Sequence, residues 1–469
     1  MNTAELNRAP EDVAGLVVTP GAGRTTFRLS LRERRALLAG ADFIVAAVAM
    51  LIAYELHPGH LVAIPLLEPL LYGATFVIAL LLTDGYGFNI PSDRTWSAIA
   101  VIRAAPIALL GSVLIFFLHP FVLNRTIIVL ALLIGSAMLI LMRITLARLL
   151  LHESLAVHAV LLADSEPRQE IIATLHAARF EYRVMKTMVE PANDTEERRD
   201  MLAKVSSTLK DSRADELIVT NNELRLLPGL AEECLVQGVR VVSASELVER
   251  YMGRVPIETI DVHWFLSLPD NDLLERPYAF ARRIADLFLS LVFSLPFLVL
   301  LPVLALLIKI DSKGPVFLVQ RRIGEHGKPF NLLKLRTMRI DAESGGARMT
   351  EKGDPRITRV GRILRTTRLD EFPQLVNIFM GEMSFIGPRP ERPEIIKDLE
   401  RQIPHFRSRL LVKPGLTGWA QTRSGYASTV DEMERKLEYD LYYIKNRSLR
   451  LDLQILAATF ITVLGWKGR

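Results

Sequence analysis

The sequence predicts a membrane protein of three parts: four N-terminal transmembrane helices, a small central α/β domain, and an α-rich C-terminal domain with a re-entrant membrane helix. Half of the 469 residues are hydrophobic and 23% are charged, an apolar composition for a soluble protein of this length. Four apolar runs of near membrane-spanning length lie in the first third of the chain. Alternating strand and helix patterns then follow, and a long segment dense in charge, glycine and proline comes last.

The four apolar runs follow a polar segment, residues 1–35, that is rich in proline, glycine and alanine and that we expect to be disordered. Each run is close to the ~20 residues that a helix needs to cross a bilayer. The runs are residues 36–56, 61–82, 98–118 and 126–141, the last extending toward residue 151. We therefore assign residues 36–151 to four transmembrane helices.

The distribution of arginine predicts the orientation of these helices. Five arginines lie between residues 24 and 35, just before the first run, and Arg143 and Arg148 close the fourth, whereas the link at residues 57–60 has no lysine or arginine. Basic residues favour the cytoplasmic side of a membrane. The N-terminus and everything that follows the fourth run are therefore expected in the cytoplasm. The modest net charge of +5 suits lipid and phosphate better than nucleic acid.

Residues 157–268 have the pattern of a small parallel α/β domain. The expected strands are 157–162, 182–189, 216–220 and 239–243, and the expected helices are 166–178, 195–210 and 228–237. The fold is Rossmann-like, but the first strand ends at Ala163-Asp164-Ser165-Glu166-Pro167. A dinucleotide site needs glycines at this turn, so we interpret the domain as a structural or interaction domain that binds no dinucleotide. Cys234 is the only cysteine, and a single cysteine excludes intramolecular disulfides and cysteine zinc sites. We interpret Cys234 as a structural residue.

A fifth apolar run, residues 285–308, contains Pro296 and Pro302 and is basic on both sides. A fifth spanning helix would place the basic C-terminal domain outside the cytoplasm, against the charge bias. A helix that enters the membrane, breaks at a proline and returns keeps both flanks in the cytoplasm. We favour this re-entrant interpretation.

The segment from Lys334 to Arg392 has residues suited to phosphoryl transfer. Arginine recurs at positions 359, 362, 365 and 368, which predicts a guanidinium stripe on one helix face before the carboxylate pair Asp370-Glu371. Arginine binds phosphate oxygens bidentately. Two adjacent carboxylates can hold a divalent cation and leave an oxygen to attack phosphorus. The turn Gly387-Pro388-Arg389-Pro390 is rigid and can aim Arg389 inward.

Several motifs then follow one order from Lys334 to Leu453: KLRTM, RLDEFPQL, MSFIGPRPE, KPGLTGWAQ and YDLYYIKN. In this order they resemble the bacterial sugar transferase family, the monotopic phosphoglycosyltransferases. With the N-terminal helices and the α/β domain, the chain resembles the large polyprenyl glycosylphosphotransferases of exopolysaccharide biosynthesis. The resemblance implies a catalytic domain over residues 274–469.

The resemblance also implies a reaction. A sugar 1-phosphate would pass from a UDP-sugar to undecaprenyl phosphate in a ping-pong mechanism with release of UMP, as the first membrane step of exopolysaccharide, capsule or O-antigen synthesis. The enzyme would lie in the bacterial inner membrane with its catalytic domain in the cytoplasm. Glucose or galactose is the default expectation for the sugar, but Thr422–Tyr426 departs from the usual family sequence, so the donor is left open.

The family's residue roles carry over to matching positions. Asp370 would be the nucleophile, and Asp370 and Glu371 would hold Mg²⁺. Phosphate would be bound by Arg365, Arg389, Lys334 and Arg336, with Asp341, Pro388 and Pro390 in support. No role is assigned to the matching Lys413, Gly415 and Trp419, and interfacial anchoring is the alternative for Trp419.

Two other functions stay open. A membrane-bound nucleotide-sugar dehydratase would need a glycine-rich turn and a Tyr-x-x-x-Lys pair. The turn is missing, and Tyr182 and Lys186 fall in an expected strand. A non-catalytic scaffold would have lost its charged site, which this sequence retains. We also expect residues 451–466 to lie in the membrane interface and the central domain to offer a surface for a homodimer.

Overall fold

The computed structural model describes residues 31–57, 67–83, 85–86, 94–118, 125–150, 157–163, 171, 174–175, 182–189, 195–220, 229–260, 262–269, 275–339, 354–425 and 429–464. The chain forms two compact units, Met1–Met252 and Gly253–Arg469. The first unit contains a helical bundle and an α/β domain. The second contains the charged motifs of the C-terminal segment.

The four expected N-terminal helices are present. They are α1 (Leu31–Glu55), α2 (Leu67–Leu82), α3 (Arg94–Leu118) and α4 (Arg125–Leu150). Helix α1 begins inside the segment expected to be disordered, and residues 1–30 lie outside the described residues. By length and apolar composition, α1, α3, α4 and a later helix, α11 (Glu275–Asp311), could each cross a membrane, whereas α2 is a shorter apolar helix.

The bundle is closed by an ion pair between α1 and α4. Arg143 Nη2 lies 2.6 Å from Asp42 Oδ2, and both side chains are buried. Arg143 also donates from Nη1 to the carbonyl of Gly85 and stands over the Tyr86 ring. Charged groups within an apolar bundle are stable only when paired in this way, so the pair fixes α4 against α1.

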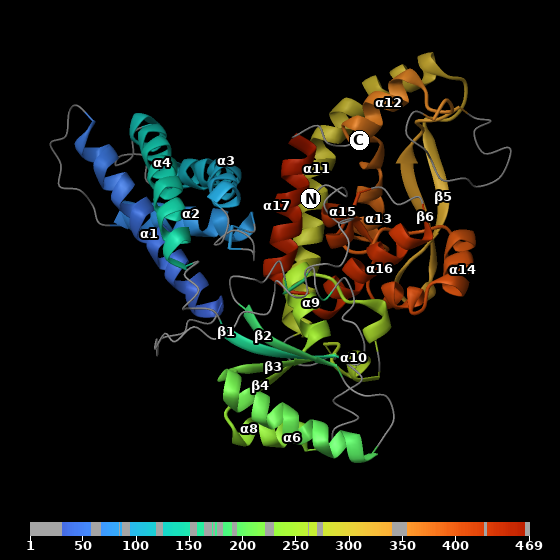
Figure 1. Ribbon diagram of the computed structural model, residues 1–469. Helices are drawn as coiled ribbons and strands as arrows, with labels where there is room; N and C mark the ends of the chain where they lie inside the picture. The colour runs from blue at the N-terminus through green and yellow to red at the C-terminus, as the bar shows by residue number, and fades with distance from the viewer. Residues whose placement is uncertain are drawn as a thin grey trace. The chain divides into compact units, whose positions relative to one another are not determined.

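The α/β domain confirms the expected strands. Strands β1 (Val157–Ala163), β2 (Tyr182–Val189), β3 (Glu216–Val219) and β4 (Arg240–Ser243) form a parallel sheet in the order β2-β1-β3-β4. Figure 1 shows α6 (Thr195–Ser212) and α8 (Leu230–Val236) on one face of the sheet and α9 (Ala244–Met252) on the other. Cys234 is buried in the core between α8 and the sheet, which supports its structural interpretation. Of the expected glycine-free turn, residues 164–167 lie outside the described residues.

The second unit begins at Gly253, earlier than expected. The 3-10 helix η3 (Ile257–Thr259) and α10 (Val262–Leu266) were assigned from the sequence to the central domain. Their side chains Ile257 and Trp264 instead pack with Ile396, Phe406 and other core residues of the second unit. The backbone agrees, because Val255 N–H donates to the carbonyl of Glu438.

The second unit is built mainly from helices, with short sheets. An antiparallel hairpin, β5–β6, follows α11, and a two-stranded parallel sheet, β7–β8, lies in the core with Trp419 and Tyr443. Its elements are α11 (Glu275–Asp311), β5 (Phe317–Ile323), η4 (Glu325–Gly327), β6 (Pro329–Leu335), α12 (Arg359–Thr366), η5 (Leu369–Glu371), α13 (Gln374–Met380), β7 (Ser384–Ile386), α14 (Pro393–Gln402), η6 (Phe406–Leu411), β8 (Gly415–Thr417), α15 (Trp419–Arg423), α16 (Val430–Lys445) and α17 (Leu449–Leu464).

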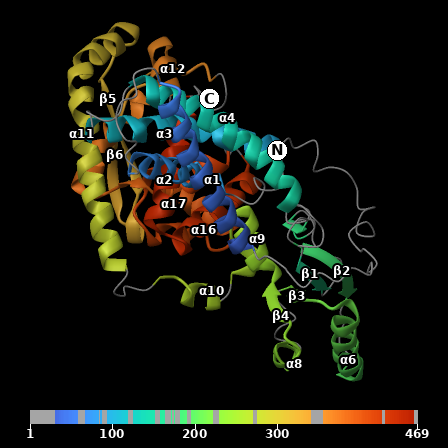
Figure 2. The same ribbon diagram turned by 90° about the vertical axis from the view of Figure 1, so that its left-hand side faces the viewer.

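Helix α11 is continuous over 37 residues and contains both Pro296 and Pro302. The expectation that a proline interrupts the helix is therefore not met. In Figure 2 the yellow ribbon of α11 is curved along its length, and proline commonly bends a helix that packing holds together. Packing is extensive here, since Phe297, Leu304 and Ile308 share a core with Leu335 and Leu364.

Polar contacts tie both ends of α11 to the second unit. Near its start, Asp286 Oδ1 accepts from Ser384 Oγ and from Phe385 N–H, and Arg282 donates to Ser384 Oγ. At its end, Asp311 Oδ2 accepts from Val360 N–H over 2.8 Å. The opposite face exposes apolar side chains along the helix, among them Leu291, Leu298, Val299, Val303, Leu306 and Ile310. The helix thus lies along one domain and turns an apolar face outward.

The expected interfacial segment at the C-terminus forms α17. One of its faces is in the core, where Leu451 and Ile455 are buried. Asp452 is also buried and accepts hydrogen bonds from Tyr278 and Tyr443. Leu453 and Phe460 on the other face are exposed. This helix is therefore a core element with a partly apolar outer face.

Candidate active site

The carboxylate pair lies in a tight turn between two helices. Helix α12 ends at Thr366, and Arg368 adopts a left-handed backbone conformation with φ 60° before η5. A residue other than glycine adopts this conformation rarely, and such positions are common at functional sites. Asp370 and Glu371 follow directly and are 8% and 9% exposed. The turn therefore buries two adjacent carboxylates.

The two carboxylates have different partners. Glu371 Oε1 accepts from Arg389 Nη2 over 2.8 Å and lies 3.5 Å from Arg368 Nη1. Although burial acts in the opposite direction, Arg389 and then Arg368 hold the pKa of Glu371 below its usual value. Asp370 Oδ1, in contrast, is buried without a hydrogen-bond partner among the described residues. Burial, and then the charge of Glu371, raise the pKa of Asp370 to about 6.

Three cationic side chains from separate elements surround Asp370. Lys334 comes from β6, Arg365 from α12 and Arg389 from the turn after β7, and each acts to lower the pKa of Asp370. Burial, and then the neighbouring guanidinium groups, lower the pKa of Lys334 to about 8. Asp370 is therefore mainly ionised at neutral pH and faces a concentration of positive charge suited to phosphate oxygens.

Arg365 is oriented by the end of the hairpin. Its Nε donates to the hydroxyl of buried Thr337 over 2.9 Å. A side chain at Gly361 would place its Cβ 2.1 Å from the carbonyl oxygen of Thr337, so only glycine permits α12 to approach the segment after β6 so closely. The KLRTM motif therefore contributes Thr337 as well as Lys334 to the site.

Other predicted residues lie elsewhere. The Arg336 guanidinium donates to the carbonyls of Lys313 and Ser312, just past the end of α11, and is 6% exposed. These contacts do not place it with the other predicted phosphate ligands. Asp341 lies outside the described residues. Of the arginine series, Arg359 and Arg362 are exposed on α12, whereas Arg368 lies beyond the end of that helix.

The turn that carries Arg389 rests on the KPGLTG segment. The Pro388 carbonyl accepts from Gly415 N–H, and Gly387 N–H donates to the carbonyl of Thr417. A Cβ at Gly415 would lie 2.1 Å from Gly387 N, and one at Gly418 would lie 2.2 Å from Gly387 O. These glycines are required by backbone contact, which explains the role of a motif that the sequence alone left unassigned.

Trp419 belongs to the same support. It is 7% exposed and stacks on Tyr442, with ring centroids 5.8 Å apart. Its Nε1 donates to the carbonyl of Gly253. These contacts make Trp419 a core residue and contradict the alternative of an interfacial anchor.

Comparison with known proteins identifies the segment that carries this site. Residues 277–466 match the family model described as "Bacterial sugar transferase". The chain is 40% identical over 185 residues to a UDP-glucose:undecaprenyl-phosphate glucose-1-phosphate transferase of Caulobacter vibrioides, which covers 39% of this chain and 69% of that relative. The chain belongs to the bacterial sugar transferase family. The matched segment contains every described residue of the charged site.

Further relatives of this bacterial sugar transferase differ in length and name. A UDP-N-acetylgalactosamine-undecaprenyl-phosphate N-acetylgalactosaminephosphotransferase of Aeromonas hydrophila is 39% identical over 232 residues, 49% of this chain and 54% of the relative. The exopolysaccharide production protein PSS of Rhizobium leguminosarum bv. phaseoli is 39% identical over 189 residues, 39% of this chain and 94% of the relative. The chain thus spans about half the length of the Aeromonas relative and nearly all of the Rhizobium one.

The dyad of this bacterial sugar transferase fits a magnesium ion that substrate helps to hold. Among the residues that the structure describes, no group of three His, Cys, Asp or Glu side chains could bind a metal alone. Asp370 Oδ1 is nevertheless a buried, ionised and unpartnered oxygen next to a second carboxylate. Mg²⁺ commonly uses one or two carboxylates and completes its shell with water and substrate phosphate. Asp370 and Glu371 would supply those carboxylates.

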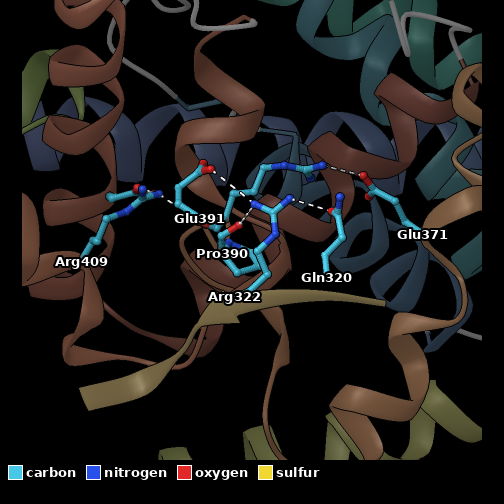
Figure 3. A network of polar contacts seen from close by, with 8 residues as sticks. Gln320, Arg322, Glu371, Pro390, Glu391 and Arg409 are labelled. Atoms are coloured by element: carbon cyan, nitrogen blue, oxygen red, sulfur yellow. Dashed lines mark hydrogen bonds and ion pairs between the residues drawn. The ribbon is translucent and has the colours of Figure 1, made fainter. Parts of the chain in front are cut away.

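Sequence reasoning did not find two arginines near the turn of Arg389. Arg322, on β5, donates to the carbonyl of Pro390, and Arg409, on η6, donates to the carbonyl of Arg389. Figure 3 shows both guanidinium groups beside the turn, with Glu371 on its far side. Neither residue stands in a segment that the charged motifs marked. The burial of Arg409, which is 5% exposed, marks it in the structure because arginine is rarely buried, but the sequence carries no signal of it.

Proposed function

We propose that this bacterial sugar transferase moves a sugar 1-phosphate from a UDP-sugar to undecaprenyl phosphate. The observation that carries the proposal is the buried, unpartnered Oδ1 of Asp370 within a group of cationic side chains. A carboxylate without hydrogen bonds keeps its lone pairs available for attack, and the cations suit the diphosphate of a nucleotide sugar. The relatives named above as undecaprenyl-phosphate transferases support the same substrates.

The reaction is proposed in two displacements. Asp370 attacks the phosphorus that bears the sugar, a bond forms from its carboxylate oxygen to phosphorus, and the bridging bond to UMP breaks. UMP leaves with the bridging oxygen. A phosphate oxygen of undecaprenyl phosphate then attacks the same phosphorus, the acyl-phosphate bond breaks, and Asp370 is regenerated as a carboxylate. The lipid product is a polyprenyl-diphosphate sugar.

The side chains around Asp370 have separate roles in this scheme. Lys334, Arg365 and Arg389 bind phosphate oxygens and neutralise charge that develops at phosphorus. Glu371 holds Arg389 in place through the 2.8 Å hydrogen bond. Bound Mg²⁺ would add charge neutralisation at the diphosphate. We propose for Arg336 a structural role at the end of α11, because its guanidinium is used by two backbone carbonyls.

The sugar is proposed only as a class, a UDP-hexose or its N-acetyl derivative. The glucose or galactose expected from the sequence is one choice, and the relatives' names include both glucose and N-acetylgalactosamine. The test is a panel of UDP-sugars, including these, with undecaprenyl phosphate, Mg²⁺ and the full-length protein in lipid nanodiscs. We expect UMP from at least one donor, and no UMP when Asp370→Asn replaces the wild type.

The same panel separates the alternatives. A scaffold would release no UMP from any donor. A dehydratase would convert the sugar and keep the nucleotide diphosphate intact. The structure weakens the dehydratase alternative, because Tyr182 and Lys186 both lie in β2, where four residues span about 13 Å.

We propose that both ends of α11 lie on the same side of the inner membrane, as the re-entrant interpretation requires, although no proline breaks the helix. The second unit would then lie at the cytoplasmic face of that membrane. The contacts of Asp286 and Asp311 tie both ends of α11 to the same domain. A helix that crossed the bilayer would carry one of these ends, with its partners, to the other side. The exposed apolar face of α11 can instead enter one leaflet while the polar face remains on the protein.

A homodimer through the central domain stays a prediction.

A further inference from the structure

We propose that Arg409 and Arg322 are positioning residues that hold the backbone of the Arg389 turn so that Arg389 meets the dyad. The proposal rests on the proposed function, since it concerns the same reaction. Neither arginine is placed in contact with substrate. Both would act through Arg389, whose guanidinium reaches Glu371.

Arg409 holds the turn from inside the protein. Its Nη2 donates to the carbonyl of Arg389 over 3.1 Å and to Asp440 Oδ2, on α16, over 2.9 Å. The side chains of Arg409 and Asp440 are 4% and 3% exposed. Asp440 therefore fixes the buried guanidinium of Arg409, which also donates to the backbone of Arg389. Arg389 in turn contacts Glu371.

Arg322 holds the next carbonyl from the hairpin. Its Nη1 donates to Pro390 O over 2.9 Å, and its Nη2 donates to Gln320 Oε1 over 3.0 Å. A longer-range ion pair joins Arg322 to Glu391 over 3.6 Å. In Figure 3 the Arg322 guanidinium lies between Gln320 and the turn. Two side chains from elements far apart in the sequence thus bind two successive carbonyls.

Backbone hydrogen bonds complete the support on either side. The Pro388 carbonyl accepts from Gly415 N–H, and the Glu391 carbonyl accepts from Ile323 N–H. Four successive carbonyls, from Pro388 to Glu391, are therefore all bound. The two central carbonyls, those of Arg389 and Pro390, are bound by arginine side chains rather than by backbone N–H groups.

The position of this turn matters because the Arg389 side chain is not itself buried. It is 41% exposed, so packing restricts its rotamers only in part, and a displaced backbone would move the guanidinium away from Glu371. Small displacements of a group that stabilises charge at the reacting phosphorus are costly, on the order of 100-fold in rate for 1 Å. Fixing the backbone is the means by which this structure places Arg389.

The first test is a double-mutant cycle in full-length protein. Arg409→Lys keeps the cation beside Asp440, so no buried charge is left alone, but a single ammonium cannot reproduce the shared guanidinium contacts. We expect kcat/KM for the UDP-sugar to fall at least tenfold. In an Arg389→Lys background the same change should cost less than twofold, because its effect passes through Arg389. Arg322→Lys should behave alike.

Matched controls lie next to each arginine. Arg407 on η6 is 79% exposed, and Arg321 on β5 is exposed. Arg407→Lys and Arg321→Lys should keep kcat/KM within twofold of the wild type. Full multiplication of the Arg409 and Arg389 effects would show a merely structural role for Arg409 and overturn the proposal.

The second test needs no turnover. Hydrogen–deuterium exchange should be faster at the amides of Gly387 and Gly415 in Arg409→Lys and Arg322→Lys than in the two controls. Unchanged exchange in both variants would overturn the proposal. If the wild type releases no UMP from any donor, the proposed function fails while exchange still reports whether the turn is held. If turnover is present and the cycle is additive, only the positioning role fails.

Discussion

Arg389 donates a 2.8 Å hydrogen bond to Glu371, and no hydrogen bond among the described residues reaches Oδ1 of the adjacent Asp370. Two neighbouring carboxylates are thereby given different chemistry. Glu371 is held ionised by arginine and serves as an anchor, whereas Asp370 keeps a free oxygen and a pKa raised to about 6. This difference leads to the first prediction.

Asp370→Asn should abolish formation of a covalent phosphosugar, because the amide lacks the attacking anion. Wild-type protein mixed with a UDP-sugar labelled in the β-phosphate, without lipid, should retain label that undecaprenyl phosphate then removes. Glu371→Gln should lower turnover by about 100-fold or more through loss of the Arg389 contact and of metal binding, yet still trap label slowly. Label on Asp370→Asn, or none on an active wild type, would favour direct attack by the lipid phosphate.

The pH profile of donor kcat/KM should be bell-shaped. Asp370 attacks as the anion, so activity should fall as pH drops below about 6, where the carboxyl becomes protonated. Lys334 binds phosphate as the cation, so activity should also fall as pH rises above about 8, where the amine loses its proton. Lys334→Arg should remove the basic limb and keep the acidic one. The exposed Lys328→Arg is the control, and a flat profile from pH 5 to 9 would contradict both assignments.

Gly415→Ala should disrupt the support of the Arg389 turn. The added Cβ would meet Gly387 N at 2.1 Å and Thr417 O at 2.4 Å, and overpacking against backbone typically costs about 2 kcal/mol or more of unfolding free energy. Gly425→Ala, where a Cβ has nothing within 4 Å, should change stability by less than about 0.5 kcal/mol. Denaturant unfolding of both variants measures the difference, and equal values would show that the contact is not required.

The two flanks of α11 should lie on the same side of the membrane. In a Cys234→Ser background, single cysteines at the exposed Leu266 and Lys328 should both resist an impermeant maleimide in intact cells and react after permeabilisation. His57→Cys, in a link expected outside the cytoplasm, is the positive control. Labelling of Lys328→Cys alone would mean that α11 crosses the bilayer.

The elements with strong local patterns could be predicted from the sequence. The β-branched runs of β1 to β4 and the apolar runs of α1, α3 and α4 are local signals, and the structure places them at nearly the expected bounds. Lys334, Arg365, Asp370 and Arg389 were found through motifs in a fixed order, and the structure brings their side chains together.

What the sequence could not predict depends on contacts between distant segments. Arg322 and Arg409 are far apart in the sequence, and nothing near either one indicates a carbonyl as its partner. Arg336 stands within a predicted motif, yet its partners are the carbonyls after α11. Pro296 and Pro302 predicted a break because proline lacks a donor, but the packing of α11 on the domain keeps one continuous helix.

The unpartnered oxygen of Asp370 also has a consequence for the preparation of this protein. A carboxyl whose pKa rises from 3.8 to about 6 on folding destabilises the folded state above pH 6, on the order of 2–3 kcal/mol, and has no such effect below about pH 4. Asparagine at this position removes the buried charge. Asp370→Asn should therefore melt at a higher temperature than the wild type at pH 8 and at a similar one at pH 4. The inactive variant would be the more robust sample, and it would keep an intact donor in place for crystallography or cryo-microscopy.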